Sequence, residues 1–420
     1  MKKKVVAVLT CAAMTASMLA GCGDSSTTES SSTGSTSGTS TSTTTEETAE
    51  APAADDAEAE SDLDGSWPEE NILIGMEVYD TTDEQFLALQ DYFTYLEDYY
   101  NISFMYSESL DSAEAELDFI GSCASAGCKA IIGYYNVAGA EAIQQTIDQG
   151  MYYWGTEQYY DEFADNDHYL GCYTFIEDGE TYNGDYLGGY ELGYSLGKQG
   201  IEHVFYCNGG AGMGIQMFID RQEGFEVGVA AAQAEGAAIQ YDPSTDVVEG
   251  WPDAPDFAAA VGAKLNGDYD GVAVSFNAAA LFQPIMDADL EESIHVATIG
   301  EVSETYYDFV QSGMISTVVY DCEEVVFANA IPQILNAVTG HVDATRDADG
   351  KAGKVLVNRW TVADTDSYNA IFEHHTQGKY FVTADDLADC LVELNPDATF
   401  DSMSSFYNSL DLDAALSIAQ

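Results

Sequence analysis

Residues 72–106 read ILIGMEVYDTTDEQFLALQDYFTYLEDYYNISFMY, and this stretch decides the fold. It begins and ends with the apolar runs Ile72–Met76 and Ile102–Tyr106, which are typical of buried strands. Between these runs, apolar residues recur three and four positions apart, which predicts an amphipathic helix; they are Phe86, Leu89, Phe93, Leu96 and Tyr100. A strand, a helix and a strand in this order predict a parallel βαβ unit.

The same alternation continues along the chain in two series. In the first series we expect helices at 113–126 and 138–149 and strands at 130–133, 151–154 and 169–176. A Gly- and Asp-rich loop follows, and the second series begins with a helix at 185–198. Its further strands are expected at 203–207, 238–241, 271–275, 295–299 and 316–319, and its helices at 215–235, 256–265, 278–287 and 303–312. Short strands alternating with helices predict an α/β fold of two doubly wound, parallel-sheet, Rossmann-like lobes, joined near residues 176–178. Because ligands of such sheets bind beyond the carboxyl ends of the strands, the expected site is a cleft between the lobes.

The first 22 residues have the pattern of a secretory signal. Lys2, Lys3 and Lys4 precede an apolar run that ends in Leu19-Ala20-Gly21-Cys22. The alternative is a membrane-spanning anchor, but the run of about 16 residues is shorter than the ~20 that a bilayer requires. The ending resembles the lipobox of bacterial lipoproteins, and this resemblance implies a signal peptide over 1–21 and a diacylglycerol on Cys22.

Residues 22–70 are rich in Ser, Thr, Gly, Ala and acids, and we expect them to form a disordered tether. The whole chain of 420 residues has 73 acids against 12 lysines and arginines. Nucleic acids and anionic membrane surfaces require clustered cations, so both are excluded as partners of the body, and a neutral or cationic ligand is favoured.

Other motifs predict neither a metal site, nor a cofactor, nor catalysis. Gly193-Tyr194-Ser195-Leu196-Gly197 has the spacing of a nucleophile elbow, but it lies inside a predicted helix rather than at a strand-to-helix turn. The neighbouring pair His374-His375 lacks the helical spacing of two metal ligands. Beyond Cys11 and Cys22 we expect six structural cysteines, with a bridge between Cys123 and Cys128 as an open alternative.

One motif in the second series is more specific. Arg221-Gln222-Glu223-Gly224-Phe225 resembles the Arg-x-x-Gly-Phe motif of the type I periplasmic sugar-binding proteins, and it lies in the expected helix after strand 203–207. The order of elements over 71–360 and the pair Gly188-Gly189 resemble that family as well. The family's return to the first lobe is matched by strand 316–320, a helix over 323–339 and a third hinge strand at 354–360.

The resemblance implies two lobes joined by a three-strand hinge. The first lobe would comprise 71–177 with 321–356, and the second 178–320 with 357–383. Residues 384–420 form a C-terminal extension that the family does not explain.

The resemblance also implies ligand-binding residues in the second lobe. Arg221 corresponds to the ligand-binding arginine, whose planar fork can donate to two sugar hydroxyls; the alternative is an ion pair with Asp220 or another acid. Asn277 corresponds to a ligand asparagine, although the aspartate that follows it in the family is Ala278 here. Glu301 replaces the cleft aspartate, and Tyr320 replaces a hinge glutamine.

In the first lobe, the resemblance assigns Glu157 to the place of the family's aspartate after its fifth strand. The polar and stacking contacts after the first strand would come from Tyr79, Asp80, Asp83 and Phe86. Asn136 follows the strand at 130–133. Trp251 lies in a loop that could close over the cleft or cover a helix end.

The resemblance implies an extracellular solute receptor of an ABC importer, which binds a small neutral polar ligand, above all a sugar, and performs no reaction. Its partners would be the permease and its ATPase, and it would act as a monomer held by its lipid on a Gram-positive cell membrane. A receptor that reports to a membrane signalling protein is the alternative role, and a nucleoside, polyol, oligosaccharide or autoinducer sugar is an alternative ligand. An acidic hydrolase has no supporting motif.

Overall fold

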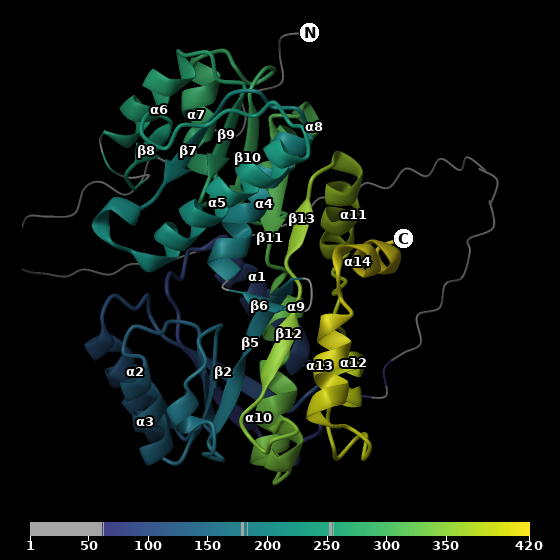
Figure 1. The fold of residues 1–420 in the computed structure, drawn as a ribbon. Helices are drawn as coiled ribbons and strands as arrows, with labels where there is room; N and C mark the ends of the chain where they lie inside the picture. Colours follow the sequence, from purple (N-terminus) through teal and green to yellow (C-terminus); the bar gives the residue numbers. More distant parts are fainter. Residues whose placement is uncertain (1–60, 62, 178–179, 183, 252–253, 255) are drawn as a thin grey trace, which may run out of the picture. The chain divides into compact units, whose positions relative to one another are not determined.

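A computed structural model describes residues 61, 63–177, 180–182, 184–251, 254 and 256–420 (Figure 1). The predicted signal peptide, Cys22 and the tether as far as residue 60 lie outside the described residues. Among the helices that the structure does describe, none has both the length and the apolar character needed to cross a bilayer.

The first lobe is built on a sheet with the strand order β12-β5-β4-β3-β1-β2, in which β6 pairs with β5. Its neighbouring strands are parallel except for the β5–β6 hairpin. The strands are β1 (Ile72–Met76), β2 (Ile102–Tyr106), β3 (Ala130–Gly133), β4 (Tyr152–Gly155), β5 (Tyr169–Glu177), β6 (Glu180–Tyr182) and β12 (Lys354–Val357). The helices of this part are α1 (Glu84–Glu97), α2 (Ala113–Ala126), α3 (Ala140–Asp148), α9 (Glu323–Phe327) and α10 (Ala330–Val338), with short 3-10 turns η1 (Asp161–Phe163) and η3 (Val342–Thr345).

The second lobe is built on a sheet with the order β13-β11-β10-β9-β7-β8, in which only β13 is antiparallel to its neighbour. The strands are β7 (Val204–Asn208), β8 (Val247–Glu249), β9 (Gly271–Val274), β10 (His295–Ile299), β11 (Ile315–Tyr320) and β13 (Trp360–Val362). The helices are α4 (Gly184–Lys198), α5 (Gln216–Ala234), α6 (Phe257–Leu265), α7 (Ala279–Asp287), α8 (Glu304–Ser312) and α11 (Thr365–Thr376), with a 3-10 turn η2 (Ala211–Met213). All residues of β7 and β9 are buried, as expected for parallel strands covered on both faces. The predicted α/β fold with two parallel-sheet lobes is confirmed.

One predicted strand is wrong. The segment 238–241 forms only an isolated bridge between Gln240 and His203. The edge of the second sheet is instead β8, whose Val247 and Val248 pair with Tyr206 and Cys207. Both segments are rich in strand-forming residues, and the sequence alone does not say which of them reaches the free edge of β7.

The helix expected over 323–339 is interrupted. The structure has α9 up to Phe327 and then a turn at Ala328 and Asn329, before α10 begins at Ala330. The reason is Pro332, which lacks an N–H and whose ring clashes with the carbonyl four residues earlier in a continuous helix. In the structure Pro332 lies in the first turn of α10, where proline is tolerated.

The third hinge strand is divided between the lobes. The run expected at 354–360 forms β12, which joins β5 of the first sheet, and β13, which joins β11 of the second. Asn358 and Arg359 are the residues that pass from one sheet to the other.

The C-terminal extension lies beside this hinge (Figure 1). It contains α12 (Ala384–Asp389), α13 (Phe400–Asn408) and α14 (Leu412–Ile418). The Tyr100 hydroxyl of the first lobe donates to the Ala384 carbonyl at 2.5 Å, and the Trp360 indole N–H donates to the Leu410 carbonyl at 3.0 Å. The extension is therefore bonded to residues of both lobes.

Residues 63–70, which the sequence places with the tether, lie against the first lobe. The Trp67 ring meets the Tyr100 ring edge-on at 6.1 Å, and its indole N–H donates to Glu393 at 2.8 Å. Leu63 also packs against the apolar core. Apolar side chains in a polar stretch thus extend the folded body toward the N-terminus.

The six cysteines of the described residues are all free and buried. Cys123 and Cys128 form no disulfide, and the Cys123 thiol lies 4.0 Å from the Met105 sulfur.

Candidate functional site

Charged side chains gather where the carboxyl ends of the strands of the two sheets meet. Glu157 lies near Asp185 and Asp321 and near two arginines, Arg221 and Arg359. Glu301 lies near Asp83, Asp321 and Glu323. We call this group the interlobe cluster; it consists of Asp83, Glu157, Asp185, Arg221, Glu301, Asp321, Glu323 and Arg359. At its edge, Glu84 of α1 accepts hydrogen bonds from Ser303 and Thr305 at the start of α8, so the lobes touch there.

Arg221 is held by an acid from the neighbouring helix. Its Nε and Nη2 both lie 2.8 Å from Asp185 Oδ1, and its Nη1 donates to the Ser275 carbonyl at 2.5 Å. The Arg221 side chain is 15% exposed. The ion pair that the sequence left open is thus present, with Asp185 rather than Asp220 as the partner, and it directs the guanidinium toward the end of β9.

Glycines bring α4 and α5 close enough for this pair to form. A Cβ atom on Gly189 would lie 1.9 Å from the Arg221 carbonyl oxygen, and one on Gly224 would lie 1.9 Å from the Tyr186 carbonyl oxygen. Gly228 continues the same contact, because its Cβ would lie 2.1 Å from the Tyr190 carbonyl oxygen. Gly224 of the motif and Gly189 of the pair therefore allow contact between the two helix backbones, whereas Gly188 leaves room for Arg359, whose Nη1 would lie 2.6 Å from a Cβ at this position.

Replacing Gly224 by alanine should destabilise the protein. The added methyl group would overlap the backbone of α4, which cannot rotate away as a side chain can, so we expect a loss of about 1–3 kcal/mol in the free energy of unfolding. Urea denaturation measures this change. Gly214→Ala is not a suitable control because its φ is +81°, whereas Gly262→Ala in α6 is suitable because its Cβ meets open space. An unchanged unfolding midpoint for Gly224→Ala would contradict the close contact.

Arg359 forms the second ion pair of the cluster. Its Nε and Nη2 donate to the two carboxylate oxygens of Asp321, and its Nη1 donates to the Gly184 carbonyl. The guanidinium also lies 4.4 Å from the centre of the Phe175 ring. Arg359 thus joins the β11–α9 crossing to the start of α4, and its side chain is only 7% exposed.

Glu157 follows β4 and sits between the two arginines. Its φ of 46° is in the left-handed region, which is unusual for a residue other than glycine, and Tyr173 donates to its Oε1 at 3.4 Å. The loss of hydration between the lobes, together with the negative charge of Asp185, raises the pKa of the Glu157 carboxyl group to about 7. The positive charges of Arg359 and Arg221 act in the opposite direction. Strained backbone and a perturbed carboxyl group at one position are common at binding sites.

Glu301 and Glu323 form a second centre within the cluster. Their carboxyl groups are within hydrogen-bonding reach of each other. Burial, with the neighbouring Glu323, raises the pKa of Glu301 well above its usual value. Burial and the nearby Glu324 also raise the pKa of Glu323, to about 7. Glu323 is 2% exposed, and within the described part of the chain no group donates a hydrogen bond to its Oε1.

The structure places the other predicted residues of the second lobe in varied surroundings. Tyr320 is 2% exposed, and its hydroxyl donates to Glu323 at 3.1 Å, so it supports this carboxylate and presents no open ring face. Asn277 accepts hydrogen bonds from the Ala279 N–H and the Tyr306 hydroxyl, both at 2.9 Å. Trp251 is 38% exposed and meets the Phe218 ring edge-on, beside residues outside the described ranges.

In the first lobe, only some of the predicted residues belong to the cluster. Asp83 precedes α1 and lies near Glu301, whereas Phe86 is 2% exposed and packs in the core against Tyr106. Tyr79 is 54% exposed and stacks on Tyr135. Asp80 accepts hydrogen bonds from Thr82, and Asn136 donates to Gln158 and accepts from Tyr160. Phe86 is thus a core residue, because its place on the buried face of α1 outweighs its proximity to the end of β1.

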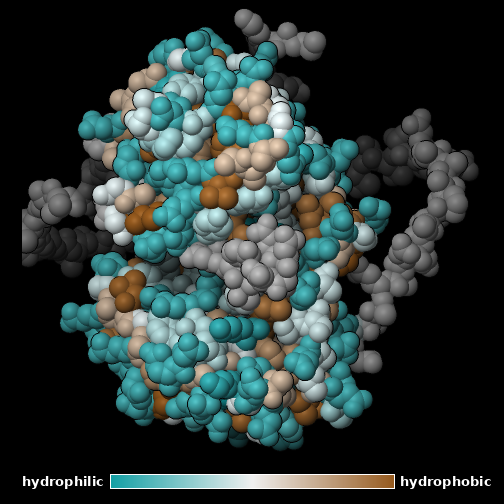
Figure 2. All heavy atoms as spheres, in the orientation of Figure 1, coloured by the Kyte–Doolittle hydropathy of each residue, from teal (hydrophilic) through white to brown (hydrophobic). Residues whose placement is uncertain are grey.

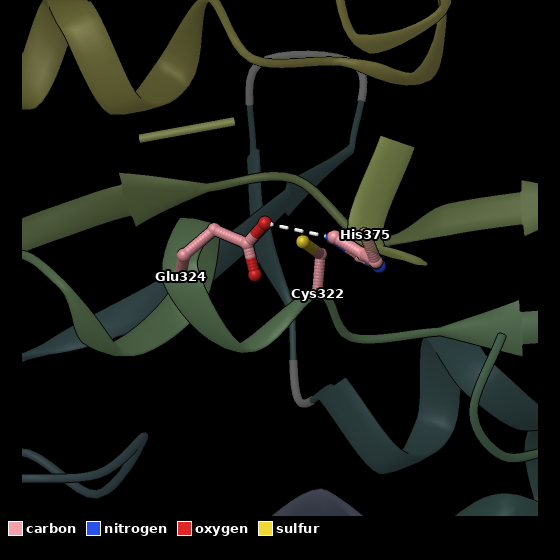
Figure 3. Close-up of side chains that lie close together, drawn as sticks. All are labelled: Cys322, Glu324 and His375. Carbon is pink, nitrogen blue, oxygen red and sulfur yellow. Dashed lines mark hydrogen bonds and ion pairs between the residues drawn. The ribbon is translucent and has the colours of Figure 1, made fainter. Parts of the chain in front are cut away.

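A trio of potential metal ligands lies behind the cluster at the hinge (Figure 3). One ligand atom each from Cys322, Glu324 and His375 lies within 4.8 Å of the others, and this donor set could hold a zinc ion. Two of the three already form an ion pair, because His375 Nε2 lies 2.9 Å from Glu324 Oε1. This Glu324 oxygen also accepts a hydrogen bond from the Phe381 N–H. Burial raises the pKa of the Cys322 thiol well above its usual value, which disfavours the thiolate. The arrangement is a buried ion pair that joins α9 to α11.

This ion pair should make stability depend on pH. Burial opposes both charges, yet the attraction to His375 lowers the pKa of Glu324 to about 2, and the attraction to Glu324 raises the pKa of His375 above 6.5. The contribution of His375 is complete below its unfolded pKa and is lost as the pH rises through its folded pKa. The contribution of Glu324 is present above its unfolded pKa of about 4.5 and is lost as the pH falls toward 2. The pair therefore stabilises the protein most between about pH 4.5 and 6.5.

His375→Gln tests this dependence. Melting temperatures measured from about pH 4.5 to pH 9 should show that the variant loses most stability relative to wild type near pH 5.5 and least above pH 8. His168→Gln is the control, because His168 precedes β5 and stacks on Tyr152 at the amino-terminal end of β4, whereas the ion pair lies between α9 and α11. A difference between His375→Gln and wild type that does not vary with pH would overturn the assignment.

Sequence reasoning missed Asp185, Asp321, Glu323 and Arg359. Arg359 carried a usable signal, because it is one of only three arginines in the chain and lies between the two hinge strands. The three acids carried no such signal, because the chain has 73 aspartates and glutamates and the sequence does not distinguish these three from the others.

Comparison with known proteins identifies the fold. No protein-family model matches the sequence, and no curated protein sequence is similar to it. Solved structures do match. A solute-binding protein of an ABC transporter from Bacillus halodurans C-125, with bound myo-inositol, is 12% identical over 72% of this chain and 98% of its own, with a TM-score of 0.54. The arabinose-binding component of an ABC transporter from Shewanella sp. ANA-3 is 15% identical over 73% of this chain and 96% of its own, with a TM-score of 0.53.

The same architecture also matches a protein of another class. The transcriptional repressor ascG of Escherichia coli is 14% identical over 70% of this chain and 99% of its own, with a TM-score of 0.52. At such low identity the matches establish the architecture, and the resemblance inferred from the Arg221–Phe225 motif is confirmed at this level. With its two parallel sheets, divided hinge strand and matching solved structures, the chain has the type I periplasmic binding protein fold.

Proposed function

We propose that this protein is a solute receptor that binds a small polyhydroxylated ligand between its two lobes. The observation that carries the proposal is the interlobe cluster, which brings two guanidinium groups and six carboxyl groups from both lobes to one place. Carboxylates accept and guanidinium groups donate strong, directional hydrogen bonds, which suits a ligand rich in hydroxyl groups. Solved structures of this fold with bound myo-inositol or arabinofuranose support a sugar or cyclitol as the ligand class.

No reaction is assigned to the site. Ser195 of the Gly-x-Ser-x-Gly stretch lies within α4 and is 6% exposed, whereas a nucleophile elbow needs an exposed serine at a strand-to-helix turn. Ligand contacts from both lobes would stabilise the closed arrangement relative to an open one, and this difference is what a partner protein can recognise.

The partner and the location belong to the proposal. We propose that an ABC permease with its ATPase receives the ligand, and that a lipid on Cys22 holds the receptor at the outer face of the cell membrane. On the face drawn in Figure 2, hydrophilic residues cover most of both lobes, and hydrophobic residues form small separate patches, which suits a receptor that meets its partner reversibly. Mass spectrometry of the N-terminal peptide from a bacterial membrane fraction tests the anchor, since an unmodified Cys22 would exclude it.

A thermal-shift screen tests the ligand class. The purified protein should melt at a higher temperature in millimolar concentrations of at least one pentose, hexose or cyclitol, because a ligand at 100 times its Kd adds about 2.7 kcal/mol to the free energy of unfolding. Nucleosides and amino acids form the comparison sets. Stabilisation by a member of these sets alone would refute the proposed ligand class.

A further inference from the structure

The charges of the interlobe cluster do not balance. Arg221 is paired with Asp185, and Arg359 is paired with Asp321. Four carboxyl groups then remain, from Asp83, Glu157, Glu301 and Glu323, and none of these forms an ion pair within the described part of the chain. Glu157 is attracted by Arg221 and Arg359, and His375 is near Glu323. For Asp83 and Glu301, the charged neighbours among the described residues are further acids.

The centre of this imbalance is the contact between Glu301 and Glu323. Glu301 follows β10 of the second lobe, whereas Glu323 begins α9, which lies beside α1 of the first lobe. Tyr320 donates to Glu323 Oε2 at 3.1 Å, whereas Glu323 Oε1 is buried and receives no hydrogen bond from the residues that the structure describes. Two carboxyl groups that meet in this way need either a shared proton or a cation between them.

The surroundings suit an organic cation. Tyr134 lies near Asp83, Glu301 and Glu323, and its hydroxyl donates to Gln85 at 2.8 Å. An aromatic side chain beside several carboxylates is a favourable environment for an ammonium group, which has three N–H donors and is attracted by the ring face. Arg221 and Glu157, on the other side of the cluster, would then form hydrogen bonds with the hydroxyl groups of the same ligand.

We propose that the ligand is a polyhydroxylated amine, an amino sugar or an aminocyclitol, whose ammonium group binds between Glu301 and Glu323 and joins the two lobes. This inference rests on the proposed function and specifies its ligand. The ammonium group donates to Glu323 Oε1, which has no donor among the other residues that the structure describes, and to a Glu301 oxygen. It replaces the proton that the two carboxyl groups otherwise share, and the raised pKa of both groups agrees with their need for such a partner.

Matched ligand pairs test the proposal. Calorimetric titration at about pH 7 compares glucosamine with glucose, galactosamine with galactose, and an amino-substituted inositol with myo-inositol. We expect at least one amine to bind 10-fold or more tightly than its neutral counterpart. In Glu301→Gln/Glu323→Gln the preference for the amine over its neutral counterpart should fall below 3-fold, because the amine loses two charged partners, whereas the neutral sugar loses only two acceptors that glutamine partly replaces.

Controls separate charge from folding. The double glutamine variant keeps the size of both side chains and removes their repulsion, so its melting temperature without ligand should equal or exceed that of wild type. Glu235→Gln removes an exposed acid at the far end of α5, where Glu235 pairs with Lys198, and it should retain the preference.

The outcomes distinguish this inference from the proposed function. Neutral sugars that bind as tightly as their amines would overturn the inference and leave the proposed function standing. Binding by no member of any pair, together with a failed sugar screen, would refute both. Stabilisation by Ca²⁺ alone, lost in Glu301→Gln/Glu323→Gln, would show that the cation is a metal ion and would overturn the assignment of an amine.

Discussion

Arg359→Ala should lower the free energy of unfolding by about 3–5 kcal/mol, the largest stability loss that we expect from a single substitution in this chain. The variant would leave Asp321 beside Glu157 and Glu301 without its cation, and it would also remove a donor from the Gly184 carbonyl and the packing against Phe175. Removing one partner of a buried pair costs more than the pair itself contributes, because the other charge stays in a medium of low polarity. Urea denaturation measures the loss.

Two further variants test the explanation. Arg359→Met/Asp321→Leu replaces both charges by apolar side chains and should recover most of the loss, because no uncompensated charge remains. Arg359→Lys keeps the charge but cannot donate to both oxygens of Asp321, so its stability should fall between those of wild type and Arg359→Ala. A double variant as unstable as Arg359→Ala would show that packing, not charge, dominates at this position.

Arg221→Ala should weaken ligand binding by about 30-fold or more, which corresponds to the ~2–5 kcal/mol cost of truncating one partner of a desolvated charge pair. The probe is the sugar, cyclitol or amine that gives the largest shift in the thermal screen. The variant removes the donors that Arg221 offers and also leaves Asp185 beside Glu157, where a further negative charge disfavours the closed arrangement. Calorimetric titration gives the change in Kd.

The matched control for this variant is Lys198→Ala. Lys198 and Glu235 form the other ion pair between α4 and α5, at the opposite ends of the same two helices, and their side chains are both 51% exposed. Exposed pairs contribute little, so Lys198→Ala should leave Kd unchanged. Equal effects of the two substitutions would mean that Arg221 acts only through the contact between the helices, and unchanged binding by Arg221→Ala would exclude it from the site.

The fold was predictable because its evidence is local. Ile72–Met76 and the periodic positions of α1 identify a βαβ unit without any distant residue, and the same holds for most elements of both sheets. The errors occur where local preference is ambiguous. Segments 238–241 and 247–249 both favour a strand, and only pairing with β7 selects the second of them.

The site was only partly predictable, for a related reason. Arg221 stands in a recognisable motif, but its partner Asp185 is 36 residues away, and Arg359 and Asp321 are 38 residues apart. Such pairs depend on the register of packed helices and hinge strands, which a single sequence does not reveal. Phe86 shows the opposite case, since its helical periodicity already marked it as a core residue.

The C-terminal extension changes the mechanics of the hinge. The chain passes between the lobes before α4, between β11 and α9, and between β12 and β13. It passes a fourth time between α13, which lies on β12, and α14, which lies on α11 and β13. The fourth passage is hydrogen bonded to the third passage, between β12 and β13. Asn358 donates to the Asn408 carbonyl at 2.8 Å, and Trp360 donates to the Leu410 carbonyl. Because these hydrogen bonds tie the third and fourth passages together, the two have to move as one unit when the lobes open or close about the hinge.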